Sequence, residues 1–210
     1  MPFDTDFFTA PLTAYLRAHG LPADIDGVAR AKELGLKPHR FERSGELLRV
    51  RRVLGALAGL MPTELLDIGT GRGAFLWPLM DRFPELPVTC VDPLEHRVER
   101  LRQVRHGGIE TLTPLVGDVT TLPFPDAAFD GVTILEVLEH LPHPERAVAE
   151  LVRVARRFVV ASVPSKPDDN PEHLRLYTAD TLTELFQSAG RPVAVRCEYL
   201  LNHIVAVVML

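Results

Sequence analysis

The segment Leu65–Phe75, LLDIGTGRGAF, decides the fold. Its apolar run ends in an aspartate, Asp67, and is followed by glycines at every second position: Gly69, Gly71 and Gly73. Glycines between a strand and a helix allow a tight turn and let backbone amides approach a ligand at the helix N-terminus. The segment therefore predicts a strand, a ligand-binding loop and a helix, in that order.

Strand-like and helix-like segments alternate on both sides of this loop. The expected strands are 64–69, 87–92, 113–118, 129–136 and 157–164, and the expected helices are 44–60, 73–83, 94–106, 144–155 and 178–190. The strand segments are continuously apolar and rich in Val and Ile, which is typical of parallel strands buried on both faces.

The last segment, 193–210, departs from this alternation. It holds two strand-like runs joined by a short turn near Leu201 and Asn202. A turn this short has no room for a crossover helix, so the two strands must be antiparallel. The sequence predicts an α/β, Rossmann-like, doubly wound, mostly parallel seven-stranded sheet with a C-terminal antiparallel strand.

Residues 1–45 differ from the rest of the chain. Prolines break them into short helix-like pieces, 12–20 and 25–35, which end in Gly20 and Gly35. Pieces this short cannot form a core alone. We expect residues 1–45 to be an N-terminal helical cap or lid over an acceptor pocket. Residues 46–210 would then be the Rossmann-like domain, and Ser44 the N-cap of its first helix.

Composition excludes several classes of protein. The chain has 210 residues, 46% of them hydrophobic, and a net charge of −5, which suits one globular domain and does not favour nucleic acid as a partner. Cys90 and Cys197 lie in apolar stretches and are expected to be buried thiols in a reducing compartment. No apolar run is long enough to span a membrane, and the N-terminus is acidic where a secretory signal is basic. We expect a cytoplasmic monomer or homodimer with no membrane partner.

Two further acids follow later strands. Asp92 ends the strand after the glycine loop, where a carboxylate accepts ribose hydroxyl hydrogen bonds, and Asp118 ends the third strand, where a nucleoside base would lie. A nicotinamide-dependent short-chain enzyme would need a lysine four residues after a tyrosine. Tyr15, Tyr177 and Tyr199 are followed there by His19, Thr181 and His203. The nicotinamide interpretation is therefore rejected.

Four segments in order, DIGTGRGAF, CVDPLEHRVERL, GDVTTLPFPDAAFD and VTILEVLEHLPHPERAVAELVRVA, resemble the class I S-adenosylmethionine-dependent methyltransferases, and among them the ubiquinone-biosynthesis O-methyltransferases. The resemblance covers about residues 38–190 and implies S-adenosylmethionine as cofactor. The cofactor-binding residues that it implies are Arg40, Asp67, Gly69, Thr70, Gly71, Gly73, Asp92, Pro93, Asp118, Val119 and Leu135.

The resemblance also implies a role for each of these residues. Asp67 and the glycine loop would hold the methionine end, Asp92 the ribose, and Asp118 with Val119 the adenine. Leu135 would line the floor, and Arg40 would reach the cofactor carboxylate. One departure is Arg156–Arg157, where the family has a Gly-Gly turn, which we expect to alter a loop and no motif.

A cluster of acids and histidines follows the fourth strand. On the expected helix, Glu136, Glu139 and His140 share one face, and His173 from the next loop could join them. Such ligands suit Mg²⁺, Mn²⁺ or Zn²⁺, and the ubiquinone-pathway and small-RNA 3′-terminal ribose methylases carry the same arrangement as a metal site. Acids at a helix start or in a substrate pocket also explain the pattern, so both interpretations stay open.

The sequence favours methyl transfer to a small-molecule acceptor at oxygen, with His140, His143 or His173 as the general base. Two alternatives remain. One is a metal-containing methyltransferase of the 3′-terminal RNA ribose 2′-hydroxyl. The other is a partner protein that binds S-adenosylmethionine without catalysis.

Overall fold

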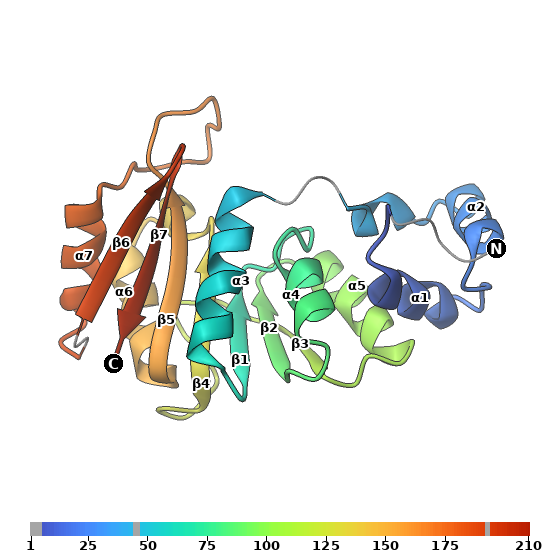
Figure 1. The fold of residues 1–210 in the computed structure, drawn as a ribbon, viewed down its shortest axis with the longest axis horizontal. Helices are drawn as coiled ribbons and strands as arrows, with labels where there is room; N and C mark the ends of the chain where they lie inside the picture. The colour runs from blue at the N-terminus through green and yellow to red at the C-terminus, as the bar shows by residue number, and fades with distance from the viewer. Residues whose placement is uncertain (1–5, 44–46, 192–193) are drawn as a thin grey trace.

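The computed structural model describes residues 6–43, 47–191 and 194–210, so the predicted Ser44 cap lies outside the described residues. Figure 1 shows one sheet between helices. The helices are α1 (Thr9–Ala18), α2 (Ile25–Glu33), η1 (Pro38–Phe41), α3 (Leu48–Leu60), α4 (Leu76–Arg82), α5 (Glu95–His106), η2 (Leu138–His140), α6 (Pro144–Val154) and α7 (Ala179–Gln187). The strands are β1 (Leu65–Ile68), β2 (Val88–Asp92), β3 (Leu112–Val116), β4 (Phe129–Leu135), β5 (Ala155–Pro164), β6 (Ala194–Leu200) and β7 (His203–Met209).

The sheet confirms the predicted architecture. Its seven strands run in the order β3-β2-β1-β4-β5-β7-β6. Strands β1 to β5 pair in parallel, whereas β7 is antiparallel to both β5 and β6. The turn between β6 and β7 falls at Leu201 and Asn202, as expected.

Both faces of the sheet are covered, which explains the continuously apolar strands. Successive side chains of a strand point to opposite faces, so Leu65 belongs to one hydrophobic core and Leu66 to the other. Helices α3, α4 and α5 bury their apolar sides in the first core, and α6 and α7 bury theirs in the second.

The strand order places a ligand site at one edge of the sheet. From β1 the chain leads outward to β2 and β3, and then returns to β4 on the other side of β1. The loops that leave the carboxyl ends of β1 and β4 therefore separate at this point, and α/β sheets bind ligands in such a crevice.

The N-terminal segment lies against α5 and the start of α4, at the β3 end of the sheet (Figure 1). The backbone of Gly107 approaches the Ala14 carbonyl so closely that a Cβ would lie 1.7 Å from its oxygen. Phe41 stacks on Trp77 with ring centroids 4.9 Å apart. These short helices pack on the sheet domain, and their apolar side chains join its core.

Two local expectations were wrong. Arg156 and Arg157 lie within β5, at an irregularity in its pairing with β4, and both form ion pairs with the buried Asp130. Cys90 is buried as expected, but Cys197 is only half-buried because β6 is an edge strand. No described helix is long and apolar enough to cross a membrane.

Candidate functional site

The glycine loop has a conformation that other residues could not adopt without strain. Gly69, Gly71 and Gly73 all have positive φ, at 74°, 59° and 88°. A Cβ on Gly69 would lie 2.3 Å from Val137 Cγ2, and one on Gly73 would lie 2.1 Å from Trp77 Nε1. Two of the three glycines are therefore required by close packing as well as by φ.

A cavity of about 570 Å³ opens over this loop at the carboxyl ends of β1, β2 and β4. Seven predicted cofactor residues line it: Asp67, Gly69, Thr70, Gly71, Asp92, Pro93 and Leu135. We call it the cofactor cavity. The structure thus brings together residues from the ends of three strands that are far apart in the sequence.

Asp67 is a buried carboxylate at the floor of this cavity. Thr133 Oγ1, from the neighbouring β4, donates a 2.7 Å hydrogen bond to Asp67 Oδ1. Burial raises the pKa of Asp67 to about 7, and the negative charge of Asp92 adds to the increase. A positively charged ligand group would favour the ionised form of Asp67.

Asp92 is fully buried at the end of β2. Its carboxylate accepts hydrogen bonds from the backbone amides of Gly71 and Leu94, both at 3.0 Å, and from Arg97 Nη1 at 3.3 Å. Asp92 therefore fixes the glycine loop and faces the same cavity. Ligand hydroxyls that donate to Asp92 would compete with Arg97, whose side chain is 35% exposed.

The remaining predicted cofactor residues lie around the cavity but do not line it. Asp118 is exposed, and its Oδ1 accepts from the amide and hydroxyl of Thr120. Val119 is buried in the second core. Arg40 and Gly73 line a neighbouring cavity. The adenine and carboxylate contacts implied by the resemblance stay predictions.

Glu136 does not lie on a helix, contrary to expectation. It follows β4 with a φ of 55°, and η2 begins only at Leu138. Its carboxylate accepts from Ser162 Oγ at 2.6 Å and pairs with Arg49 Nε at 3.5 Å and His203 Nε2 at 3.1 Å. Burial opposes ionisation, but these three contacts outweigh it and hold the pKa of Glu136 below its ordinary value.

Three of the four predicted metal ligands come together. Donor atoms of Glu139, His140 and His173 lie within 4.8 Å of one another, and Glu136 is outside this group because it pairs with Arg49 and His203. Glu139 is fully buried, and neither of its oxygens has a hydrogen-bond partner among the described residues. Burial raises the pKa of Glu139 to about 8, with a contribution from the charge of Glu136.

The three candidate general bases occupy different environments. His140 lines the cofactor cavity, and its Nδ1 lies 3.0 Å from the Glu172 carbonyl oxygen. A carbonyl only accepts, so Nδ1 carries the hydrogen and Nε2 keeps its lone pair. His173 is held by Asp168 and Asn170, and the exposed His143 pairs with Glu145 outside the cavity.

Sequence reasoning missed several residues of the cofactor cavity. Arg49 and Val50 come from the start of α3, Arg97 from α5 and Glu172 from the loop before α7. The sequence signal for Arg97 was its position one helical turn after the strand-end Asp92. Arg49 and Glu172 had no signal, because only the tertiary fold brings them to the sheet edge.

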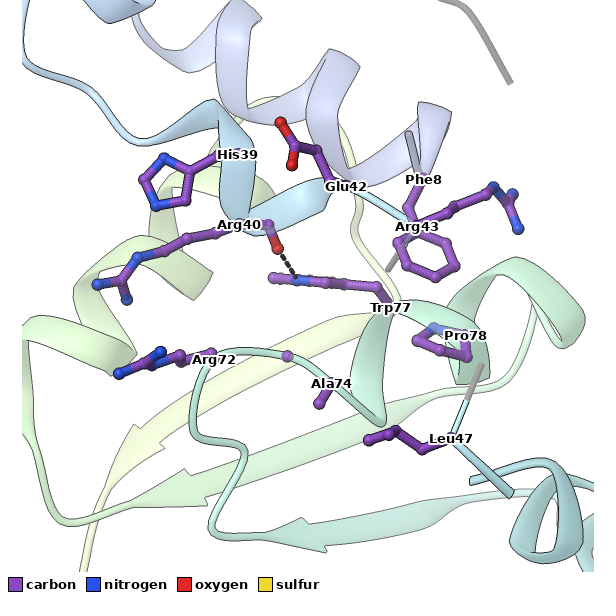
Figure 2. Close-up of a pocket in the computed structure, with 11 residues that line it drawn as sticks. Phe8, His39, Arg40, Glu42, Arg43, Leu47, Arg72, Ala74, Trp77 and Pro78 are labelled. Carbon is purple, nitrogen blue, oxygen red and sulfur yellow. Dashed lines mark hydrogen bonds between the residues drawn. The ribbon is translucent and has the colours of Figure 1, made fainter. Parts of the chain in front are cut away.

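A second cavity, of about 650 Å³, lies on the other side of the glycine loop (Figure 2). One wall is formed by Phe8, His39, Arg40, Glu42 and Arg43, and the other by Arg72–Ala74 with the start of α4. Because it contains His39, Arg40, Arg43 and Arg72, we call it the arginine cavity.

Comparison with known proteins agrees with this geometry. Residues 66–158 match the family described as a methyltransferase domain. The chain is 36% identical over 107 residues to malonyl-[acyl-carrier protein] O-methyltransferase of Geobacter sulfurreducens, and the aligned stretch covers 50% of this chain and 40% of that protein. It is 34% identical over 123 residues to demethylmenaquinone methyltransferase of Thermus thermophilus, with 56% of this chain and 54% of that protein covered.

The chain spans about half the length of these curated relatives. Among solved structures, a SAM-dependent methyltransferase from Aquifex aeolicus superposes with a TM-score of 0.65 at 24% identity, over 78% of this chain and 90% of that one. The fold, the glycine loop and the family match agree, and the domain at residues 66–158 belongs to the class I S-adenosylmethionine-dependent methyltransferases.

Proposed function

We propose that the protein transfers a methyl group from S-adenosylmethionine to a small-molecule acceptor, at oxygen. The observation that carries this proposal is the cofactor cavity, in which the glycine loop and the buried Asp67 and Asp92 lie together. Asp67 has no cation partner among the described residues, and Asp92 has the partly exposed Arg97. Such buried carboxylates suit a ligand that carries ammonium and sulfonium charges and ribose hydroxyls.

Bound S-adenosylmethionine supplies an activated methyl group on its sulfonium. The residues of this chain then have to orient the acceptor and exclude water, since the donor needs no further activation. Asp67 would hold the methionine end, Asp92 the ribose, and Leu135 the floor. The G. sulfurreducens relative is named as an O-methyltransferase, which supports oxygen as the acceptor atom.

An acceptor hydroxyl must lose its proton, and we assign His140 as the general base. It lines the cavity, and its Nδ1 contact to Glu172 leaves Nε2 free to accept a proton. His173 would act through His140, because its ring packs on that of His140 with centroids 4.8 Å apart. His143 has no such contact among the described residues.

The test is turnover with a panel of small hydroxyl acceptors, followed as S-adenosylhomocysteine formation. We expect His140→Gln to lower turnover about 100-fold, within the usual range for a general base, and to change cofactor affinity less than twofold. His106→Gln, on the exposed end of α5, is the matched control. Tight cofactor binding with no turnover on any acceptor would instead favour the non-catalytic alternative.

A divalent metal at Glu139, His140 and His173 is the second candidate for the same site, and it would replace the general-base role of His140, whose Nε2 would then be a ligand. The observation that favours it is the buried Glu139 carboxylate, whose oxygens lack partners beside two imidazoles. These donors fit Mn²⁺ or Zn²⁺, which would polarise an acceptor oxygen. Calorimetry with Mn²⁺ should give a binding heat that Glu139→Gln removes, and an unchanged heat in that variant would contradict the site.

We further propose that residues 1–45 cover the acceptor. Residues of this segment form one wall of the arginine cavity, which supports this role. The RNA alternative gains no support from the overall charge of −5.

A further inference from the structure

Of the predicted cofactor residues, only Arg40 and Gly73 line the arginine cavity. Its volume of about 650 Å³ is of the size that holds a small molecule. It shares Arg72 and Ala74 with the cofactor cavity, so the two cavities meet at the glycine loop. A ligand here would lie next to a bound cofactor.

Two guanidinium groups in this cavity lack an anion. Arg43 is engaged, because its Nη2 pairs with Asp81 Oδ2 at 2.9 Å and its guanidinium lies 4.5 Å from the Phe8 ring centroid. By contrast, the side chains of Arg40 and Arg72 have no acidic partner among the described residues. Figure 2 shows these two side chains extending in the same direction, one from η1 and one from the glycine loop.

A third guanidinium increases the positive charge near Arg40. Arg100 lies half-buried on α5, and it too has no acidic partner among the described residues. Burial lowers the pKa of Arg100, and the charge of Arg40 lowers it further, so the two guanidinium groups repel each other.

The side of the cavity away from the Arg40 and Arg72 guanidinium groups is apolar (Figure 2). It is lined by Phe8, Leu47, Trp77 and Pro78, of which Trp77 is only 2% exposed. The Trp77 ring is held in place, because its Nε1–H donates to the Arg40 carbonyl oxygen at 3.1 Å and Phe41 stacks on it. The cavity thus combines a rigid apolar side with two cations, and its lining acid, Glu42, forms no ion pair with either cation among the described residues.

We propose that the arginine cavity binds the end of the methyl acceptor remote from its reacting hydroxyl, which reaches His140 in the cofactor cavity past Arg72, and that this end carries an oxyanion beside an apolar body. The inference rests on the proposed function and names its class of substrate. Guanidinium groups match carboxylate and phosphate oxygens in geometry and charge, and the apolar side of the cavity suits a hydrocarbon body. Arg72, which lines both cavities, would hold the acceptor against the cofactor.

Trp77 gives a direct readout, because it is the only tryptophan of the chain and lines the cavity. The full chain is first titrated with S-adenosylhomocysteine by calorimetry. The saturated protein is then titrated with benzoate, phenyl phosphate or neutral benzamide while the indole N–H signal is followed by NMR. Saturating S-adenosylhomocysteine fills the site that binds its own carboxylate, so the added anions cannot bind there.

We expect benzoate or phenyl phosphate to shift the indole signal saturably, and the tighter of the two identifies the head group. Benzamide should bind at least tenfold more weakly. Arg72→Gln should weaken anion binding tenfold or more, as expected for one charge-assisted contact. The matched control Arg82→Gln, on the exposed end of α4, should bind as the wild type does.

Three results would overturn the inference while leaving the proposed function intact. They are no indole shift with either anion, equal binding of benzamide, or a shift that occurs only without S-adenosylhomocysteine. In the last case the cavity would be the site of the cofactor carboxylate. If S-adenosylhomocysteine itself fails to bind, the proposed function fails, and the acceptor assignment fails with it.

Discussion

The two cavities on either side of the glycine loop differ in charge and in origin. The cofactor cavity has buried carboxylates, Asp67 and Asp92, that stand on the ends of sheet strands. The arginine cavity has guanidinium groups that come from η1 and from the loop itself. A buried carboxylate is costly unless its ligand or its scaffold compensates for it, whereas a partly exposed cation is not.

This difference assigns the two substrates to different parts of the fold. The rigid sheet edge fixes an invariant, positively charged cofactor, and the N-terminal segment forms a cavity for a ligand of opposite charge. Changes in the sheet-edge acids should therefore affect cofactor binding most. A change in the shared loop should affect both cavities.

The largest expected effect is on cofactor binding in Asp92→Ala. This substitution removes the proposed ribose contact and also the hydrogen bond that fixes the Gly71 amide. Two charge-assisted hydrogen bonds correspond to roughly 100-fold or more in affinity. Calorimetry with S-adenosylhomocysteine measures the loss, and Asp26→Ala on the exposed surface of α2 is the control. Retained affinity in Asp92→Ala would mean that the acid is structural.

Gly73→Ala should disturb both cavities at once. The new Cβ would lie 2.1 Å from Trp77 Nε1 at a φ of 88°. Strain and overpacking together should cost about 2–4 kcal/mol of the free energy of unfolding. Urea denaturation measures this cost. Gly55→Ala, in open space within α3, should instead be stabilising by about 0.5–1 kcal/mol. A neutral Gly73→Ala would contradict the packing described for Trp77.

Cofactor affinity should depend on pH through Asp67. Its pKa of about 7 in the free protein means that it is largely protonated below pH 7, and a positively charged ligand requires the ionised form. Affinity should therefore fall as pH drops below about 7, by at most about tenfold per pH unit. Asp67→Asn should bind weakly at every pH, with a flat profile. A wild-type profile that is flat from pH 5 to 8 would contradict this assignment.

The raised pKa of Asp67 makes folding stability depend on pH in the opposite direction to cofactor affinity. The folded pKa of Asp67 lies above its ordinary value of 3.8, so the folded protein binds this proton more tightly than the unfolded chain does. The contribution of Asp67 to stability is therefore present below about pH 4 and is lost as pH rises toward 7.

The smallest expected effect is that of Arg97→Met. Arg97 forms a partly exposed ion pair with Asp92, of a kind worth about 0–1 kcal/mol, and it must move when ribose hydroxyls bind. We expect cofactor affinity to change less than about threefold. Arg102→Met on the same helix serves as the control. A loss above tenfold would show that Arg97 holds the cofactor itself.

The sequence predicted the parts of the molecule that depend on local pattern. Continuous apolar strands, the glycines after Asp67 and the short turn at Leu201 each have one simple structural solution, and the sheet agrees with them. Asp67 and Asp92 were predictable as cavity residues because the carboxyl ends of neighbouring parallel strands meet at one edge.

The parts that depend on contacts between distant segments were not predictable. Glu136 was placed on a helix by its spacing, but the chain leaves β4 through a left-handed residue, and Val137 then packs over Gly69. Its partners Arg49 and His203 come from α3 and β7. The arginine cavity likewise exists only because η1 packs on the start of α4.

The most direct test of the central claim is a calorimetric titration of the wild-type chain with S-adenosylhomocysteine. The cofactor cavity predicts saturable binding at one site per chain with micromolar affinity. An absence of binding heat across several temperatures, in a protein shown to be folded, would contradict it. The glycine loop would then be a structural turn, and the carboxylates beneath it would need another explanation.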